Sequence, residues 1–317
     1  MPELRKDYIL DRYVIIAKER AKRPEQFIDT DKDCEEPKSI EKGCFFCPGN
    51  EHMTPPELFR TGTAVRWKIR VFDNKFSAVG KEGNPLLRTD NNFFTFADAV
   101  GRHEVIVETA EHNRQLWDLS ENEITSLLQV YSMRVSDMQK DSRIKYVAVF
   151  KNHKKKAGTS IVHSHSQVIG YNIIPQNIIE KEKAVERYGY CPYCRIIGIE
   201  SGSDRRIHEN KSSVSFAPYA SAAPFEACIF PKRHVISIKE LDETELCDIA
   251  EQIALLTGKL KKLDAPFNMF LQCGTKDMHF HIVIEPRITL RAGFEYCTGT
   301  IINIMPPETA AGFYRER

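Results

Sequence analysis

The sequence predicts an α+β fold in which one structural unit occurs twice. A Cys-x-x-Cys pair, a single histidine and a His-x-His pair follow one another in each half of the chain. The first set is Cys44 and Cys47, His112, and His163 with His165; the second is Cys191 and Cys194, His234, and His279 with His281. Segments typical of strands and of helices also occur in both halves. This recurrence indicates a duplicated unit.

The first half contains strand-like segments and one long helix. Residues 66–74, 102–109 and 145–152 alternate in polarity or are rich in β-formers, as half-buried strands are. The helix is expected from Ser120, because Glu123 follows three positions later and forms a capping box before apolar residues at helical spacing. Residues 29–43 are polar and aperiodic, which predicts a surface loop.

The second half repeats this order of elements. The pattern predicts a strand and turn over 227–241, a helix over 242–263, and strands over 268–274 and 279–287. We place the boundary between the units within residues 173–190, ahead of the second cysteine pair. The predicted domains are therefore 1–172 and 173–317.

Composition and charge exclude several classes of protein. The 317 residues carry 45 basic and 44 acidic side chains, a net charge of +1. Such a balance provides no field that would attract nucleic acid or an anionic membrane, so any phosphate site must be local. The chain has no apolar signal core at its start and no apolar run near the ~20 residues of a membrane helix. We expect a cytoplasmic protein without nucleic-acid or membrane partners.

The two cysteine pairs predict two metal sites. A Cys-x-x-Cys turn presents two thiolates, and two distant histidines complete the tetrahedral set that zinc prefers. We assign two sets of ligands: Cys44, Cys47, His112 and His163, then Cys191, Cys194, His234 and His279. A zinc site of this kind contributes on the order of 10 kcal/mol to folding. The second site could hold iron instead of zinc.

Other interpretations of the cysteines stay open. The sequence Cys-Pro-Tyr-Cys at 191–194 also suits a redox dithiol, although a thioredoxin-like role lacks a flanking βαβ pattern and explains only one pair. Paired free thiols, or one site made of all four cysteines, are further alternatives. His279 and His281 lie on the same face of a predicted strand, so either could bind the second metal.

The segment SIVHSHSQVIG, residues 160–170, predicts a strand with chemistry on one face. Side chains alternate along a strand, so His163, His165 and Gln167 point to one face and the serines to the other. Imidazole is mostly deprotonated at neutral pH and can attack an activated phosphoryl group, which splits a transfer into two displacements. We assign the nucleophile to His165 and leave His163 to the metal. Gln167 can donate a hydrogen bond to phosphoryl oxygens but cannot supply an acid proton, which favours transfer over hydrolysis.

A basic turn precedes this strand. The sequence NHKKKAGTS, residues 152–160, contains three lysines and a glycine. Its backbone N–H groups and lysines could form a cradle for phosphate.

Taken together, these motifs resemble the galactose-1-phosphate uridylyltransferase family of the histidine-triad superfamily. The resemblance extends over nearly the whole chain and rests on YVIIAKERAKRP, CFFCPGN, VFDNKF, HSHSQ and AGFEYCTGTIIN. It implies duplicated histidine-triad-like units, each an antiparallel sheet with packed helices. It also implies a nucleotidyl group carried on His165 and zinc on His163.

The resemblance further implies substrate contacts and a shared site. It places Arg20 and Arg23 at the nucleotide, Asn74 and Phe76 around the base, Asn152 and Ser160 at sugar and phosphate oxygens, and Gln167 at the α-phosphoryl. Phe294 and Glu295 resemble the segment that a partner subunit offers to the hexose, so a homodimer is expected.

Three departures from the family pattern concern the substrates. Ser164 replaces the proline of the usual His-Pro-His, as in the related ADP-glucose phosphorylases, the turn at 152–160 is unusually basic, and Thr289 and Leu290 replace hexose-contacting residues. The leading hypothesis is a ping-pong exchange of UMP between UDP-glucose and galactose 1-phosphate. The alternatives are an ADP-glucose phosphorylase-like adenylyltransferase that uses phosphate, and a zinc-stabilised nucleotide-binding module without turnover.

Overall fold

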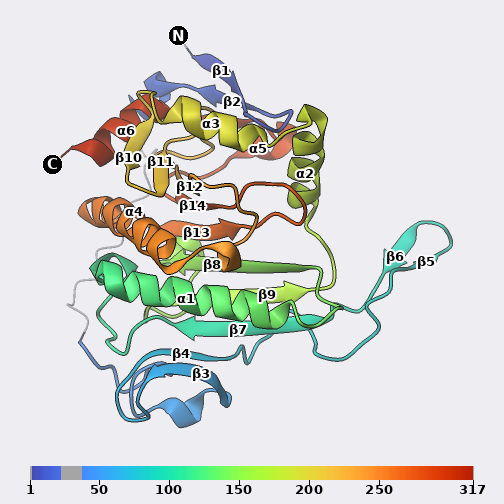
Figure 1. Cartoon of the computed structure of the whole chain (residues 1–317), viewed down its shortest axis with the longest axis vertical. Helices are drawn as coiled ribbons and strands as arrows, with labels where there is room; N and C mark the ends of the chain where they lie inside the picture. The colour runs from blue at the N-terminus through green and yellow to red at the C-terminus, as the bar shows by residue number, and fades with distance from the viewer. Residues whose placement is uncertain (1, 23–37, 317) are drawn as a thin grey trace.

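A ten-stranded sheet forms the centre of the protein, whose computed structural model describes residues 2–22 and 38–316 (Figure 1). Five strands from the first half lie side by side in the order β3 (Glu57–Gly62), β4 (Trp67–Asp73), β7 (Gly101–Val107), β9 (His165–Tyr171) and β8 (Tyr146–His153). Five from the second half continue the sheet beyond β8 in the order β13 (Phe267–Gln272), β14 (His281–Pro286), β12 (Ala227–Pro231), β11 (Ser213–Phe216) and β10 (Arg206–Glu209). Neighbouring strands of this sheet are antiparallel.

The two halves of the sheet are built alike. Each runs from an edge hairpin through one further strand to the strand that begins at the second histidine of a His-x-His pair, and ends on an inner strand. The inner strands β8 and β13 pair with each other, with Asn152 opposite Asn268. This arrangement confirms the predicted α+β fold of two related units. The boundary at residue 172 stays a prediction.

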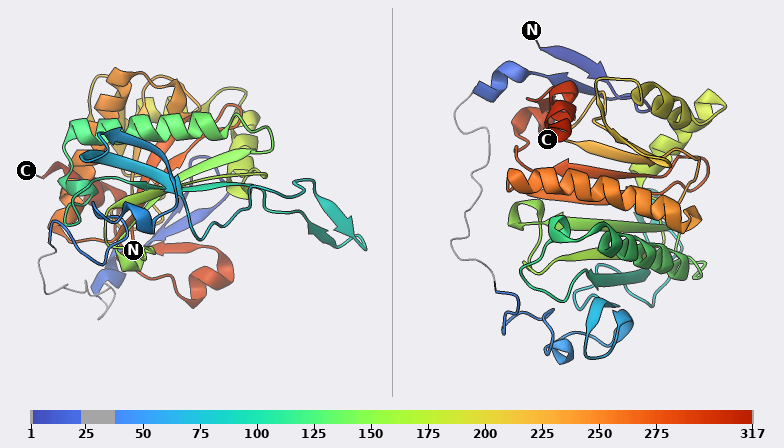
Figure 2. Two further views of the ribbon diagram at one scale, coloured as in Figure 1. Left: turned by 90° about the horizontal axis from the view of Figure 1, so that it is seen from below. Right: turned by 60° about the vertical axis from the view of Figure 1, so that its left-hand side comes forward.

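Two long helices cover one face of the sheet. They are α1 (Glu121–Met138) and α4 (Glu243–Lys262), which lie side by side across the two halves (Figure 2). Both begin at a capping box: the Ser120 side chain accepts from the Glu123 N–H, and the Asp242 side chain accepts from the Glu245 N–H. Their apolar faces pack on the sheet and form the main core. Both helices were predicted.

The opposite face of the sheet is covered by helices in the second half. The helices are α2 (Gln176–Tyr188) and α3 (Pro192–Glu200), and Ile178, Val185 and Ile197 pack there with Phe216 and Phe230. The segment proposed to contain the domain boundary therefore forms α2.

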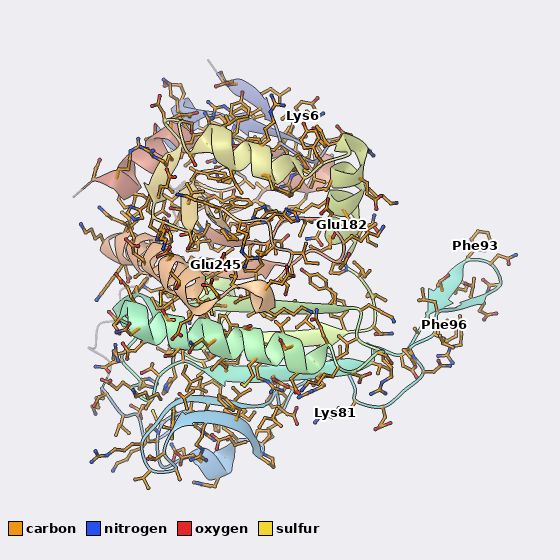
Figure 3. The ribbon with its side chains drawn as sticks, viewed as in Figure 1. Lys6, Lys81, Phe93, Phe96, Glu182 and Glu245 are labelled. Carbon is orange, nitrogen blue, oxygen red and sulfur yellow. The ribbon has the colours of Figure 1, made fainter. Side chains whose placement is uncertain are left out.

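The remaining elements lie around this core. A small sheet joins β1 (Glu3–Lys6), β2 (Tyr13–Ile16) and β15 (Ile301–Asn303). The other helices are α5 (Gly293–Thr298), α6 (Pro307–Arg315) and five 3-10 turns, η1 (Lys18–Lys22), η2 (Glu51–Met53), η3 (Leu116–Asp118), η4 (Lys155–Ala157) and η5 (Ile238–Glu240). A hairpin of β5 (Arg88–Asp90) and β6 (Phe94–Phe96) projects from the body and carries the exposed rings of Phe93 and Phe96 (Figure 3). Throughout the described residues, every helix is too short or too polar to traverse a bilayer.

Candidate active site and metal clusters

His165 is the first residue of β9. The strand therefore begins five residues later than the predicted segment 160–170, where regular pairing with the neighbouring strands starts. The alternation itself is as expected. Ser166 faces α1, where its Oγ lies 2.6 Å from the hydroxyl of Tyr131. His165 therefore points to the opposite face, where the ring of Phe46 packs on it edge to face at a centroid distance of 5.3 Å.

The hydrogen bond of His165 fixes which ring nitrogen can react. Its Nδ1 lies 2.8 Å from the carbonyl oxygen of His163, and a carbonyl can only accept. Nδ1 therefore carries the proton, and Nε2 carries the lone pair. Burial lowers the pKa of His165 below its ordinary value, which keeps the ring neutral. A neutral imidazole with a free Nε2 is suited to nucleophilic attack.

Gln167 lies on the same face of β9 as His165 and opposite Val105 of β7. Its Oε1 is 2.8 Å from Nε2 of His103 and 3.4 Å from Nδ2 of Asn74. Sequence analysis did not single out His103. Strand alternation places it on one face with Val105 and Val107, but only the register of β7 against β9 brings it to Gln167.

The serine face of β9 carries a buried charge network, also missed from the sequence. The ammonium of Lys151 lies 2.7 Å from the Glu108 carboxylate, and the two side chains are 1% and 0% exposed. Lys151 also donates to Ser164 Oγ at 2.9 Å and to the His165 carbonyl at 3.2 Å. Glu108 accepts from the hydroxyls of Ser164 and Ser166 at 2.6 and 2.8 Å. The serines are therefore partners of a buried ion pair on the side of β9 opposite to the His165 ring.

The structure brings the first predicted ligand set together. Cys44, Cys47, His112 and His163 present ligand atoms within 4.8 Å of one another. Cys44 Sγ and Cys47 Sγ each lie 3.6 Å from Nδ1 of His163, and Cys47 Sγ lies 3.5 Å from Nδ1 of His112. Nε2 of His163 donates to the Thr109 carbonyl at 2.7 Å, which orients Nδ1 toward the sulfurs.

These distances can be compared with those of a zinc site. Zinc–sulfur and zinc–nitrogen bonds of about 2.3 and 2.05 Å at the tetrahedral angle separate sulfur from nitrogen by about 3.6 Å. The observed separations of 3.5 and 3.6 Å agree with that value. Burial raises the pKa of Cys47 to about 11, and a bound cation would oppose this effect by stabilising the thiolate. The residues present therefore fit a tetrahedral metal ion.

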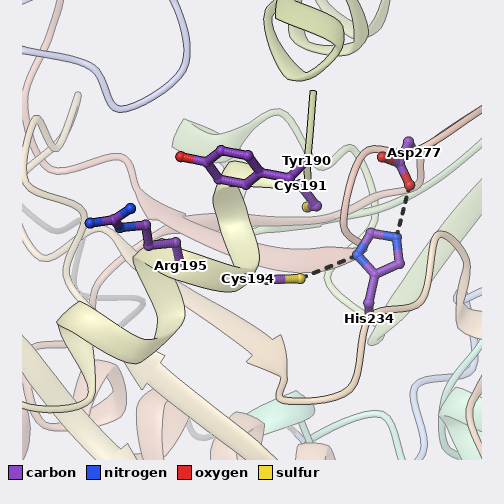
Figure 4. Close-up of a pocket in the computed structure, with 6 residues that line it drawn as sticks. All are labelled: Tyr190, Cys191, Cys194, Arg195, His234 and Asp277. Carbon is purple, nitrogen blue, oxygen red and sulfur yellow. Dashed lines mark hydrogen bonds and ion pairs between the residues drawn. The ribbon is translucent and has the colours of Figure 1, made fainter. Parts of the chain in front are cut away.

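The second predicted ligand set is also assembled, with a more open setting (Figure 4). Cys194 Sγ lies 3.4 Å from Nδ1 of His234 and 3.5 Å from Nδ1 of His279. Nε2 of His234 is 3.3 Å from the Asp277 carboxylate, an outer partner of the kind that orients metal-binding histidines. Cys194 is exposed, whereas Cys44 and Cys47 are buried.

Geometry separates His279 from His281. His279 belongs to the cluster, and its Nε2 lies 3.0 Å from the Pro231 carbonyl. Nδ1 of His281 lies 3.0 Å from the carbonyl of His279, and its ring stacks on Phe230 at 4.7 Å. His281 thus repeats the position of His165 but is 3% exposed beneath the apolar layer that includes Phe230.

The basic turn is built differently from a phosphate cradle. The N–H groups of Ala157 and Thr159 donate to the Lys154 carbonyl, and the Gly158 N–H donates to the Lys155 carbonyl. These three amides are used within the turn, because Lys154 and Gly158 adopt φ of 68° and 99°. These three amides are therefore not available to bind phosphate, and for them the prediction of a backbone cradle is wrong.

Asn152 and Ser160 flank this turn. Asn152 of β8 faces the His165 side of the sheet, because Lys151 faces the other. Its Oδ1 accepts from Nδ2 of Asn268 at 2.8 Å. Ser160 is exposed before β9.

The other predicted substrate residues are distributed over several elements of the fold. Asn74 contacts Gln167, and Phe76 follows it with an 85% exposed ring. Arg20 is half-buried in η1, and Arg23 lies outside the described residues. Phe294 and Glu295 belong to α5, where Glu295 accepts from the Ala292 N–H at 3.0 Å. α5 contacts β15 of the small sheet, which Figure 1 places apart from β9.

Comparisons with known proteins agree with this architecture. A family model described as "Galactose-1-phosphate uridyl transferase, N-terminal domain" matches residues 1–175. ADP-glucose phosphorylase of Arabidopsis thaliana is 31% identical over 99% of this chain and 93% of that protein. Galactose-1-phosphate uridylyltransferase of Thermotoga maritima is 27% identical over 100% of this chain and 98% of that protein.

Solved structures show the same fold. The crystal structure of the ADP-glucose phosphorylase from Arabidopsis thaliana with bound ADP-glucose superimposes with a TM-score of 0.86, covering 100% of this chain and 99% of that chain. The family model spans more than half of the chain, and relatives align along its whole length. The chain therefore belongs to the galactose-1-phosphate uridyl transferase family of nucleotidyltransferases.

Proposed function

We propose that this protein exchanges UMP between UDP-glucose and galactose 1-phosphate through a covalent uridylyl group on His165. The observation that carries the proposal is the tautomer of His165, whose Nδ1–H is held by the His163 carbonyl at 2.8 Å while Nε2 keeps its lone pair. The family supplies the substrates, since several relatives over most of this chain are galactose-1-phosphate uridylyltransferases.

The reaction proceeds in two displacements. Nε2 of His165 attacks the α-phosphorus of UDP-glucose, the bond from this phosphorus to the bridging oxygen breaks, and glucose 1-phosphate leaves. A phosphate oxygen of galactose 1-phosphate then attacks the same phosphorus, the N–P bond breaks, and UDP-galactose forms. Positive charge develops on the imidazole during the first step, and the hydrogen bond from Nδ1 to the carbonyl stabilises it. Gln167 donates to an α-phosphoryl oxygen in both steps.

The metal clusters have a structural role in this proposal. Cys44, Cys47, His112 and His163 would hold one zinc ion, and the second cluster would hold zinc or iron. A metal supplies fixed tetrahedral bonds to its ligands and takes no part in the displacement. Because His163 is two residues before His165, its side chain ties the start of β9 to the cysteine turn and restrains the nucleophile.

Membership of the family supports a proposal for the subunit arrangement and the location. In this proposal the protein is a cytoplasmic homodimer, and α5 of one subunit offers Phe294 and Glu295 to the hexose site of the other. The position of α5, away from His165 within one chain, supports a contribution in trans. Arg20, Arg23, Asn74, Phe76, Asn152 and Ser160 are proposed to contact the nucleotide sugar.

Similarity to an ADP-glucose phosphorylase favours ADP-glucose as a second candidate donor. The ADP-glucose phosphorylase of Arabidopsis thaliana is 31% identical over nearly the whole chain, and its ADP-glucose complex gives a TM-score of 0.86. The second candidate is therefore transfer of AMP from ADP-glucose to phosphate through the same histidine.

Intact-protein mass spectrometry after separate incubation with UDP-glucose and ADP-glucose tests both. A UMP adduct that galactose 1-phosphate removes supports the first candidate, and an AMP adduct that phosphate removes supports the second. His165→Ala must abolish either adduct while keeping the fold and bound metal. An adduct that persists in this variant would remove His165 from the mechanism.

A further inference from the structure

The amide of Gln167 is held by two side chains from neighbouring strands and loops. His103 of β7 presents Nε2 at 2.8 Å from Gln167 Oε1, and Asn74, just after β4, presents Nδ2 at 3.4 Å from the same atom. His103 is 7% exposed, whereas Gln167 and Asn74 are half-buried. The question is whether these contacts select one orientation of the Gln167 amide.

The tautomer of His103 determines which end of the Gln167 amide it can bind. The backbone N–H of Ala78 lies 3.1 Å from Nδ1 of His103, and an N–H can only donate. Nδ1 therefore carries the lone pair and Nε2 carries the proton. Burial lowers the pKa of His103, which keeps this neutral form. His103 must then donate from Nε2 to the oxygen of Gln167.

The orientation of Asn74 is fixed independently. Its Oδ1 accepts from the backbone N–H of Phe76 at 2.9 Å, so the atom facing Gln167 is the NH2 group. The NH2 of Asn74 also lies 3.1 Å from Nε2 of His103. Two donors placed this close are compatible only because both converge on one acceptor, Gln167 Oε1.

This convergence leaves one end of the amide for a ligand. Rotating the Gln167 amide by 180° would place its NH2 against two donors and leave three unsatisfied groups. The oxygen is thus fixed toward His103, and the NH2 is the end available on the His165 face. Within residues 2–22 and 38–316, no acceptor forms a hydrogen bond with that NH2.

We propose that His103 is a positioning residue that orients the Gln167 amide so that it donates to the α-phosphoryl group carried by His165. This inference rests on the proposed function and adds a residue to it. His103 itself does not touch the reacting atoms. Its effect passes through Gln167 alone, which is what the experiment must separate from a general effect on folding.

Three substitutions of His103 vary the group that faces Gln167. His103→Gln keeps a donor at nearly the same reach, His103→Leu removes it, and His103→Glu replaces it with an acceptor of the size of glutamine. We measure the single-turnover rate of nucleotidyl-enzyme formation and KM for whichever donor loads the wild-type protein. The rate should fall about tenfold for His103→Leu and further for His103→Glu, return to within about twofold for His103→Gln, and KM should change little.

A double-mutant cycle decides whether the effect passes through Gln167. In the Gln167→Ala background, His103→Leu should cause no further loss, because the group that it orients is gone. Equal losses in both backgrounds, or an unchanged rate in His103→Leu, would overturn the inference. His208→Leu, in β10 of the other half, serves as a control that should keep the full rate.

Failure of the proposed function would be recognised separately. A wild-type protein that forms no adduct with either donor would contradict the function itself. A wild-type protein that forms the adduct, with His103 variants behaving like wild type, would contradict only the role of His103. If His103→Leu does not fold, the comparison of His103→Gln with His103→Glu still decides the outcome.

Discussion

Removal of Lys151 tests the buried network behind His165. In Lys151→Met, the Glu108 carboxylate loses its counter-ion while its side chain stays 0% exposed. Burial alone would raise the pKa of Glu108, but the charge of Lys151 and hydrogen bonds from Lys151, Ser164 and Ser166 lower it overall. Breaking a buried pair by removing one partner costs about 3–5 kcal/mol.

The expected change in melting temperature follows from chain length. An unfolding entropy of about 2.1 cal/mol/K per residue gives roughly 0.7 kcal/mol/K for 317 residues. A loss of about 3–5 kcal/mol therefore lowers Tm by roughly 4–8 °C. Differential scanning calorimetry of the metal-loaded protein measures this shift.

Two further variants control the interpretation. Lys140→Met removes a lysine that is 78% exposed in its pair with Asp137, and should change Tm by less than about 1 °C. The double variant Lys151→Met with Glu108→Leu removes both charges and should recover part of the loss. If Lys151→Met melts within 1 °C of wild type, as Lys140→Met should, the reasoning about the buried pair is refuted.

Three more predictions concern packing, metal and pH. Gly101→Ala places a Cβ 1.9 Å from the Gly170 carbonyl oxygen and should lower the free energy of unfolding by more than about 2 kcal/mol. The control Gly198→Ala, in α3 with open space around the new Cβ, should stabilise the protein slightly. Urea unfolding compares the two variants, and equal effects would contradict the close approach of β7 and β9. The second metal cluster, with Cys194 exposed, should release its metal to a chelator before the first, as followed by metal analysis over time; simultaneous release would refute this order. Burial, and then the charge of Glu285, raise the pKa of Glu226 to about 7, above its unfolded value near 4.5. Between these two values the folded protein binds more protons at Glu226 than the unfolded chain does. The stability that protonated Glu226 contributes is therefore lost as pH rises from about 5 through 7. The Tm of wild type minus that of Glu226→Gln should decrease over that pH range. A constant difference would show that the pKa of Glu226 is not raised.

The sequence was informative wherever a local pattern has one physical interpretation. The start of α1 was predicted from Ser120 and Glu123, because a capping box needs only residues three positions apart, and α4 was predicted from its helical periodicity. The two sets of cysteines and histidines could be matched because their order repeats, and the structure brings both together. The alternation in SIVHSHSQ likewise separates His165 and Gln167 from the serines without knowledge of the fold.

Other features depended on contacts between distant segments. His103 is 64 residues from Gln167 and Lys151 is 43 residues from Glu108, so no spacing rule connects them. The choice of His279 over His281 required the cluster geometry and the position of Pro231, and only the folded backbone showed that the amides of Ala157, Gly158 and Thr159 are used within their own turn.

The sequence by itself therefore determined the repeated α+β plan and the residues of the two Cys/His clusters, because these follow from periodicity and from the chemistry of side chains close along the chain. The assignment of His165 as nucleophile stays a prediction. Tertiary structure alone decided strand register, tautomers and burial. Each of these depends on which distant atoms come within hydrogen-bonding distance, and local sequence does not encode that distance.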